Sequence, residues 1–458
     1  MSEQLPSPLQ NYRMRSLSQS FGFRTVVIIL LGLLMLIPLL MAEKVVTDRN
    51  TYYQEALHNI AASWGKKQTL TGPVLVVPYV EHFTNVDTVT DENGENRVVS
   101  KDIYNDRTAI LLPENLEIRA DLKEEHRQRG IYDALVYTAN VSLTGKFNHA
   151  AVLQSGEGER RILWNKAFIA IGLDDTRAID TASNFFWNDG RTGLQPGTGI
   201  SKLLPTGFHV PLSVNADSNP SNEFKLTLSL RGSDGLLFAP LGENTTIRMT
   251  SSWTHPSFQG ELLPDKHEVG EEGFHAEWDI PHLVRSYPQY WVLEDQQDKA
   301  YDLREATAGV SLYEPVSLYS RITRAVKYGA LFITLTFVVF LAFEISLKRR
   351  LHVLQYGIVG VALSLFYLIL LALAEHIGFL YAYLAAASTT VLSITFYMGA
   401  ILHNSRRTVL IFLLLATLYG LLYLLLQMED YALLVGVGLL LLALLIMMTA
   451  TRHLKQSD

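Results

Sequence analysis

Six uninterrupted runs of apolar residues stand out in the pattern of hydrophobic and polar positions along this chain. One lies near the N-terminus and five lie in the last third. Each is apolar all round, whereas a helix of a soluble protein keeps a polar face. Runs of about this length span roughly 24–35 Å as helices, which brackets a hydrocarbon core of about 30 Å. The pattern predicts transmembrane helices at residues 25–42, 328–343, 354–374, 379–401, 408–426 and 431–450.

Lys and Arg in the short connecting segments predict the orientation of these spans. Basic residues lie before the first span, between the second and third, between the fourth and fifth, and after the sixth, while the segments 375–378 and 427–430 have none. Because short basic loops stay on the cytoplasmic side of a membrane, both termini are expected in the cytoplasm and residues 43–327 outside it. The basic residues are Arg13, Arg15, Arg24, Lys348, Arg349, Arg350, Arg406, Arg407, Arg452 and Lys455.

The first span is predicted to remain in the protein as a signal anchor. Its apolar run is long for the core of a cleaved signal peptide, and Leu40 and Ala42 do not form a small-x-small cleavage site before Glu43. The expected fold class is a polytopic α-helical membrane protein with six transmembrane helices and a large external domain. We expect it in a bacterial inner membrane, with the external domain in the periplasm.

Residues 43–327 have the composition of a soluble domain. The chain has no cysteine, so this domain does not depend on disulfides. Of the 38 basic and 45 acidic residues in the chain, ten basic and six acidic ones lie outside the domain, which leaves 28 basic against 39 acidic. Because an acidic surface is repelled by phosphates, nucleic acid is not an expected partner. The expected partners are the lipid bilayer and a periplasmic protein, a membrane protein or peptidoglycan.

The period of the hydrophobic pattern changes inside this domain. Over residues 43–66, apolar positions recur mostly every three or four residues, which predicts an external amphipathic stalk helix that ends at Gly65. From residue 67 to 327 a period of two predicts a β-rich, sandwich-like domain, in which Val141 points inward and Asn140 outward. Residues 1–24 and 451–458 are cytoplasmic segments, and residues 328–450 form a five-helix block. Strands are predicted at residues 74–80, 108–112, 116–121, 135–144, 162–171, 224–230 and 246–253.

Several motifs resemble one known family. They are residues 68–78 (QTLTGPVLVVP), 175–177 (DTR), 250–264 (TSSWTHPSFQGELLP), 314–316 (EPV), 324–332 (RAVKYGALF) and 367–379 (YLILLALAEHIGF). On these motifs the chain resembles the CreD family of bacterial cell envelope integrity inner membrane proteins over nearly its whole length. The resemblance implies control by a two-component system and a role in envelope integrity, with changed tolerance to colicins and β-lactams. It implies no established catalytic residues.

The sequence has few patterns typical of catalytic or metal-binding sites. The sequence contains no HExxH, GxSxG, GxxxxGK or GxGxxG motif, so we predict a protein that is not an enzyme and has no cofactor. A group of histidines and carboxylates has spacings that match no helical pair of metal ligands, and surface or capping roles are expected for it. The group consists of His255, His267, His275, His282, Asp265 and Glu268.

The segment around Trp253 is a candidate for partner binding. His255, Pro256 and Phe258 follow this tryptophan, and exposed aromatic residues beside a rigid proline are typical of binding surfaces. The other interpretation is a strand end whose Trp253 and Phe258 side chains enter the core. Both interpretations stay open on the sequence alone.

Two further polar groups are weaker candidates. Arg177 follows Asp174 and Asp175, so it either binds an anionic ligand or forms a salt bridge with one of these aspartates. Glu375 and His376 lie in a predicted external turn, where we expect them to be solvated.

The membrane block argues against an ion-coupled carrier. The interiors of the predicted spans carry no Asp, Glu, Lys, Arg or His, and carriers normally need such groups. We therefore predict a non-enzymatic envelope protein that binds a partner through its periplasmic domain. A membrane insertase with the layout of YidC is the first alternative, although the connection 345–352 is short for that pattern. A periplasmic hydrolase is the second. Small residues that allow close helix packing are Gly357, Gly360, Ala382, Ala385, Ala386, Thr389, Thr390 and Ser393.

Overall fold

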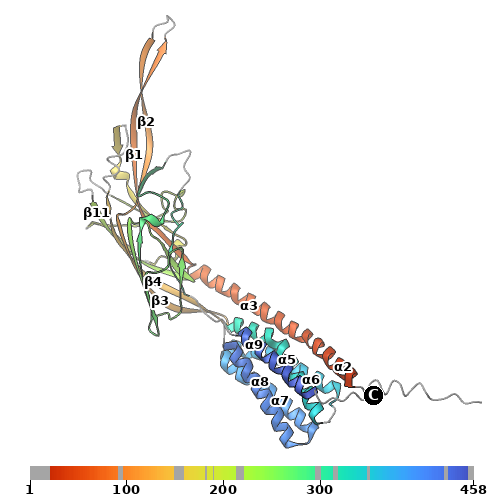
Figure 1. Ribbon diagram of the computed structural model, residues 1–458. Helices are drawn as coiled ribbons and strands as arrows, with labels where there is room; N and C mark the ends of the chain where they lie inside the picture. Colours follow the sequence, from red (N-terminus) through yellow and green to blue (C-terminus); the bar gives the residue numbers. More distant parts are fainter. Residues whose placement is uncertain are drawn as a thin grey trace, which may run out of the picture. The chain divides into compact units, whose positions relative to one another are not determined.

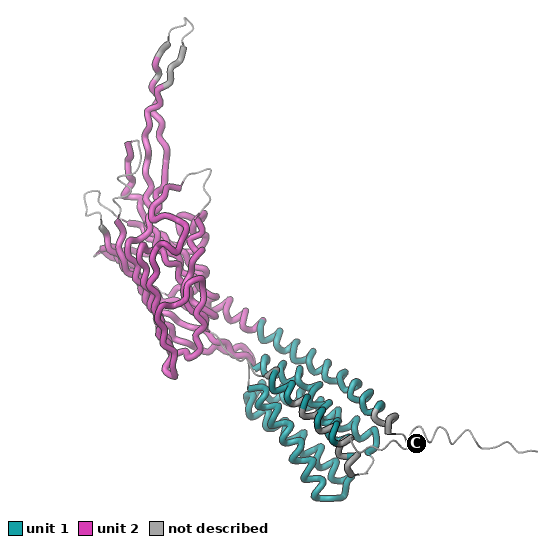
Figure 2. Tube along the Cα trace, viewed as in Figure 1, with its two compact units in different colours: residues 1–54, 316–458 teal, residues 55–315 magenta. Residues whose placement is uncertain are grey.

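The computed structural model describes two compact units of the chain, residues 1–54 with 316–458 and residues 55–315 (Figure 2). The residues whose structure is described are 21–90, 96–148, 159–180, 183–188, 190–212, 221–293, 301–312, 318–347, 351–427 and 432–451.

The first unit consists of helices (Figure 1). Five stretches of helix among the described residues are long and apolar enough to cross a membrane, at residues 26–64, 318–341, 353–377, 379–402 and 405–427. The sixth predicted span coincides with the helix α9, and the total of six spans remains a prediction. The helices are α2 (Phe21–Leu34), α3 (Leu36–Trp64), α5 (Leu318–Leu347), α6 (Val353–Ile377), α7 (Phe379–Leu402), α8 (Ser405–Gln427) and α9 (Ala432–Thr451).

The first span and the stalk form nearly one helix. The N–H of Met35 donates to the carbonyl oxygen of Leu31 at 3.0 Å, which joins α2 to α3. Pro38 lacks an N–H, so one intrahelical bond is missing beside this joint. The stretch 26–64 has 39 residues, and at 1.5 Å per residue it is about 58 Å long. Because this exceeds a hydrocarbon core, α3 continues well beyond one, and it ends at Trp64, immediately before Gly65 as predicted.

The helix α5 begins earlier than the predicted second span. Its first turns, from Leu318, lie in residues that the sequence pattern assigned to the β-rich domain. Ile322, Ala325 and Val326 lie at helical spacing and are fully buried. This buried face extends the helix into a polar stretch that hydropathy alone does not assign to a span.

The second unit contains two β-sheets whose inner faces share one apolar core, as predicted. The first sheet has the order β14-β18-β12-β1-β6-β10-β9, with β2 and β5 paired to β1 and β17 paired to β2. Its strands are β1 (Gln68–Thr90), β2 (Asn96–Leu111), β5 (Glu159–Ile162), β6 (Phe168–Leu173), β9 (Gln195–Pro196), β10 (Gly207–Pro211), β12 (Gly235–Ala239), β14 (Pro256–Gly260), β17 (Tyr290–Leu293) and β18 (Ala308–Leu312).

The second sheet has the order β15-β16-β13-β3-β4-β11-β7-β8. In its centre Val141 pairs with Leu228 and is buried, while Asn140 is exposed. The alternation predicted for these strands is confirmed. The strands are β3 (Asn115–Arg129), β4 (Tyr132–Asn148), β7 (Asn184–Trp187), β8 (Gly190–Thr192), β11 (Ser221–Ser233), β13 (Asn244–Ser251), β15 (Lys266–Gly270) and β16 (Gly273–Pro281).

The single strand predicted at residues 162–171 is wrong. Ile162 pairs with Tyr79, but Phe168 pairs with Val76. An unbroken antiparallel ladder would place residue 165 opposite Val76, so three extra residues must leave the ladder. The short 3-10 helix η1 (Trp164–Lys166) takes them up and divides the segment into β5 and β6.

The end of the stalk helix packs on the outer face of β4. Leu57, Ile60 and Trp64 contact Ala134 and Val136, and Val136 is thereby buried although it points away from the core of the two sheets. Close to its start, β4 is therefore covered on both faces.

Two arginines flank the ring of Trp64 at this junction. The guanidinium carbon of Arg127, on β3, lies 4.0 Å from the ring centroid, and that of Arg231, on β11, lies 5.2 Å from it. The indole N–H donates to the carbonyl oxygen of Tyr137 at 3.3 Å. A side chain at Gly65 would place its Cβ 2.5 Å from the carbonyl oxygen of Arg231, so glycine is required for this close approach.

The strands β1 and β2 continue beyond the body of the first sheet as a hairpin (Figure 1). They pair with each other up to Thr90 and Asn96. The pairing of β5 with β1 stops at His82, and that of β17 with β2 stops at Thr108. We call residues 83–90 and 96–103 the hairpin finger.

Candidate functional site

The Trp253 segment connects the two sheets. It follows the last residue of β13 in the second sheet and leads into β14, the edge strand of the first sheet. The indole N–H of Trp253 donates to the carbonyl oxygen of His255 at 3.0 Å, and the two rings meet edge to face with centroids 6.2 Å apart. His255 is exposed. Pro256 begins β14, a position where a strand tolerates a missing N–H.

Phe258 lies at the margin of the apolar core. Its ring centroid is 5.2 Å from that of His267, 6.1 Å from that of Phe274 and 6.0 Å from that of Trp278. Both Phe258 and Trp253 are partly buried against the core. This packing supports the interpretation of a strand end whose aromatic residues enter the core. His255 and the outer edge of β14 are the parts of the segment that a partner can reach.

The guanidinium of Arg177 forms a salt bridge with a neighbouring carboxylate. Its Nε lies 2.9 Å from Oδ1 of Asp175, and its Nη2 lies 2.9 Å from Oδ2. Hydrogen bonds from this guanidinium lower the pKa of Asp175, and Asp175 also caps the 3-10 helix η2 (Thr176–Ala178). Arg177 lies on this helix, between β6 and β7, and not on the Trp253 segment. The structure therefore favours the salt bridge over the anion site.

Asp174 has a different role from Asp175. One of its carboxylate oxygens accepts from Nη1 of Arg304 at 2.5 Å, and the other accepts from the N–H of Thr69 at 2.9 Å. Asp174 thus ties the connection after β6 to β1 and to the segment before β18, whereas the Asp175 carboxylate binds Arg177 within that connection.

The four histidines of the possible metal cluster lie on different elements: His255 precedes β14, and His282 begins a 3-10 helix after β16. His267 is on β15 and His275 on β16, where Glu268 and His275 are cross-strand neighbours. One oxygen of Asp265 accepts from the N–H of Asp279 at 2.8 Å. Within the described ranges, no group of three or more His, Cys, Asp or Glu residues is arranged to hold a metal ion.

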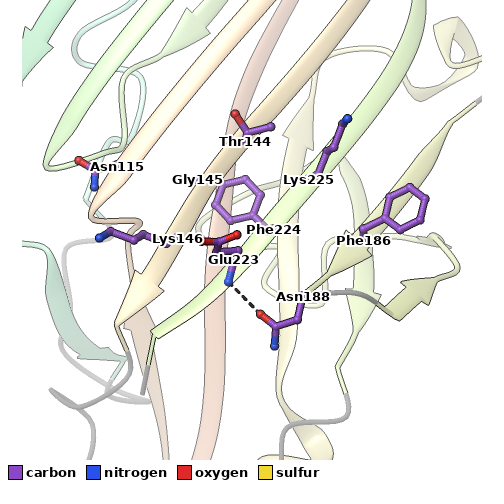
Figure 3. Close-up of a pocket in the computed structure, with 9 residues that line it drawn as sticks. All are labelled: Asn115, Thr144, Gly145, Lys146, Phe186, Asn188, Glu223, Phe224 and Lys225. Carbon is purple, nitrogen blue, oxygen red and sulfur yellow. Dashed lines mark hydrogen bonds between the residues drawn. The ribbon is translucent and has the colours of Figure 1, made fainter. Parts of the chain in front are cut away.

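A broad hollow lies on the outer face of the second sheet, and no pattern in the sequence predicts it (Figure 3). Its volume is about 750 Å³. A Cβ at Gly145 would lie 2.1 Å from the carbonyl oxygen of Asn115. This glycine therefore allows the close contact between two strands at the floor of the hollow. The amino groups of Lys146 and Lys225 point in different directions, and so they do not converge on one anion. The lining residues are Asn115, Thr144, Gly145, Lys146, Phe186, Asn188, Glu223, Phe224 and Lys225.

Glu375 is not the solvated residue that we expected. Only 8% of its side chain is exposed. The hydroxyl group of Tyr319, on α5, donates to its carboxylate at 3.0 Å, and Nε of Arg49, on α3, lies 3.9 Å away. The rings of Tyr53 and Tyr319 are 5.3 Å apart. The carboxylate thus links three helices of the first unit and has a structural role, which hydropathy cannot indicate because the partners are far apart in sequence.

Two comparisons with known proteins match the same family over nearly the whole chain. The family model described as inner membrane protein CreD matches residues 20–456. The inner membrane protein CreD of Escherichia coli (strain K12) is 32% identical over 424 residues, which cover 92% of this chain and 90% of that protein.

Similarity to solved structures is slight. An M1 zinc metallopeptidase from Deinococcus radiodurans has 10% sequence identity and a TM-score of 0.21, and a mutant two-domain M1 zinc metallopeptidase bound to L-arginine has 9% and 0.20. Each match covers 44% of this chain and 42% of the other, so this chain spans less than half of their length. Similarity at this level carries no argument about activity.

Proposed function

Because this chain belongs to the CreD family of inner membrane proteins, we propose that it is a non-enzymatic protein that contributes to cell envelope integrity by binding a partner. The binding surface belongs to the β-sheet unit, and the partner is a periplasmic protein, a membrane protein or peptidoglycan. In this proposal both termini are cytoplasmic, residues 43–327 are periplasmic, and the helical unit lies in the lipid bilayer.

The junction between the stalk helix and the sheets is the observation that carries this proposal. A helical connection is a semi-rigid spacer, whereas a flexible linker does not set the distance between the parts that it joins. Trp64 lies between two guanidinium groups and its N–H is hydrogen-bonded to β4. Within the second unit, the last turns of the stalk helix are therefore fixed to the sheets by packing and by a hydrogen bond, which supports a role for the stalk in presenting a binding surface.

Tolerance to colicins and β-lactams tests the proposed function. We expect deletion of the sheet unit to abolish complementation of a strain that lacks the gene, and Leu57→Pro to impair it strongly, because proline inside a helix costs about 3 kcal/mol or more. The matched variants Arg177→Ala and His255→Ala should complement normally. A variant of either residue that folds and inserts normally but fails to complement would indicate a chemical site and contradict the proposal.

Reporter fusions test the proposed orientation. A reporter that is active only outside the cytoplasm should be active at external positions and silent at cytoplasmic ones, because basic loops resist translocation. Activity at Arg349 would exclude the six-span topology, and silence at Asn93 would exclude a periplasmic sheet unit. The external positions are Asn93, Glu375 and Glu429, and the cytoplasmic ones are Arg349, Arg406 and Asp458, of which only Glu375 and Arg406 lie among the described residues.

A further inference from the structure

The hollow on the outer face of the second sheet is lined by two rows of side chains that cross the strands. In one row Thr144, Lys225 and Phe186 are paired in turn across β4, β11 and β7. In the next row Lys146 on β4 is directly opposite Glu223 on β11. Neighbouring strands are about 4.8 Å apart, so the first row spans roughly 10 Å of the sheet.

Charged side chains elsewhere on this face form ion pairs, whereas those in the hollow do not pair with each other. On the neighbouring strands, Nη1 of Arg248 lies 2.6 Å from Oε1 of Glu117, and such cross-strand pairs stabilise a sheet. Glu223 and Lys146 are equally well placed to pair, but among the described residues Nζ of Lys146 lies 3.8 Å from Oε2 of Glu114 instead. Pairing within the sheet therefore does not explain the charges in the hollow.

The polar groups in the hollow keep most of their hydrogen-bonding capacity. The backbone N–H of Glu223 donates to Asn188 at 3.0 Å, but within the described chain its carboxylate, the amino group of Lys225 and the hydroxyl group of Thr144 have no partner. They offer an acceptor, a donor and a group that can do both. Figure 3 shows that the ends of the Lys225 and Glu223 side chains are well apart. They therefore suit a ligand that extends along the hollow rather than one small ion.

Phe186 adds an apolar surface to these polar groups. Its neighbours Phe185 and Trp187 are buried in the core, whereas Phe186 points to the outer face and is half-buried. A sugar matches this combination, because it has C–H groups on the faces of its ring and hydroxyl groups around the edge. The anchor residues of protein partners instead need well-packed pockets from which water is excluded, and this hollow is broad and mostly polar.

We propose that the hollow binds the glycan strand of peptidoglycan, with a sugar ring packed on Phe186 and its polar groups hydrogen-bonded to Glu223 and Lys225. The volume of about 750 Å³ lies within the range of sites that bury most of a small ligand. The peptides attached to this glycan carry carboxylates, which Lys146 and Lys225 can bind at separate points. This inference rests on the proposed function, because it selects one of the partners named there and requires a periplasmic sheet unit.

Sedimentation with purified peptidoglycan sacculi tests the inference on the full-length protein in detergent. We expect the protein to sediment with the sacculi. An excess of the tetrasaccharide of N-acetylglucosamine should release it, because this compound has the N-acetylated sugar but no peptide. Absence of sedimentation would overturn the inference. Release by free stem peptides but not by the tetrasaccharide would also overturn it, because the protein would then bind the peptide and not the glycan.

Charge reversal in the hollow tests where the glycan binds. Lys225→Glu should weaken binding to sacculi about tenfold or more, because it replaces a donor by a second carboxylate beside Glu223. Lys225 is exposed, so this variant keeps the fold. Lys123→Glu makes the same change at an exposed position of β3 outside the hollow and should alter binding little. Equal losses for the two variants would show that net charge alone governs sedimentation and would contradict the proposed site.

Truncation of the aromatic ring gives a second comparison. Phe186→Ala should weaken binding about tenfold, because the sugar loses its apolar contact. Tyr104→Ala removes an exposed ring from the first sheet and should leave binding unchanged. Unchanged binding by Phe186→Ala would overturn the site.

These results separate the glycan site from the proposed function. If sacculi are not bound while deletion of the sheet unit still abolishes complementation, the glycan site is wrong and the proposed function stands. If that deletion has no effect on tolerance, the proposed function itself fails.

Discussion

Val141→Asp is expected to unfold the β-sheet unit. Val141 is 2% exposed and lies between the two sheets, opposite Leu228. An unpaired carboxylate at this position loses its hydration without gaining a partner, and we expect a loss of more than about 4 kcal/mol in the free energy of unfolding. The measurement is urea denaturation of the fragment 55–315, followed by tryptophan fluorescence. Its far-UV circular dichroism before denaturant is added should be typical of β-strands.

Asn140→Asp is the matched control. It places the same carboxylate one residue earlier, on the exposed face of β4. Because this carboxylate stays hydrated, we expect the free energy of unfolding to change by no more than about 0.5 kcal/mol. Similar midpoints for the two variants would show that the alternation along β4 has been assigned wrongly. A spectrum of the unsubstituted fragment dominated by helix would contradict the two-sheet fold.

Trp64→Ala is expected to loosen the junction between the stalk and the sheets. The substitution removes the ring between Arg127 and Arg231 and the N–H donor to Tyr137. From the lost packing and cation–π contacts we expect the free energy of local opening to fall by about 2 kcal/mol. This corresponds to roughly a 30-fold increase in the population of the open junction. Trypsin should then cleave after Lys66 or Lys67 at least tenfold faster in the full-length protein.

Two other variants define what Trp64 contributes. Ser63→Ala changes the adjacent, exposed residue of the stalk and should leave the cleavage rate unchanged. Trp64→Phe keeps an aromatic ring between the arginines and should give an intermediate rate. If Trp64→Ala cleaves no faster than the unsubstituted protein, the junction is not a rigid support, and the main argument for a partner-binding scaffold is lost.

The sequence predicted the parts of the fold that follow from one buried face or an all-apolar helix. The end of the stalk at Gly65 and the alternation around Val141 are examples. The hairpin finger was missed because a period-two pattern requires one face to be buried, whereas Phe83 and Val86, on opposite faces of β1, are both exposed. The break at η1 was missed because it arises from the register of two strands against β1, which no local pattern contains.

Prediction of the candidate site was limited by similar causes. The sequence left Trp253 and Phe258 open between a binding surface and a strand end, because only packing against Trp278 and its neighbours distinguishes a core aromatic residue from an exposed one. Glu375 was expected in solvent because its sequence neighbours suggest a turn. Its partners, Tyr319 and Arg49, come from helices that are distant in sequence.

The junction around Trp64 also has a consequence for the order in which the chain matures during synthesis. Its indole N–H contacts Tyr137, 73 residues later, and its ring contacts Arg231, on a strand that is synthesised later still. At about 5–20 residues per second, a ribosome needs roughly 8–33 s to extend the chain from Trp64 to Arg231. During this interval the stalk helix can already have formed, while the ring of Trp64 still lacks its contact with Arg231. This interval is when the nascent chain has most to gain from a chaperone.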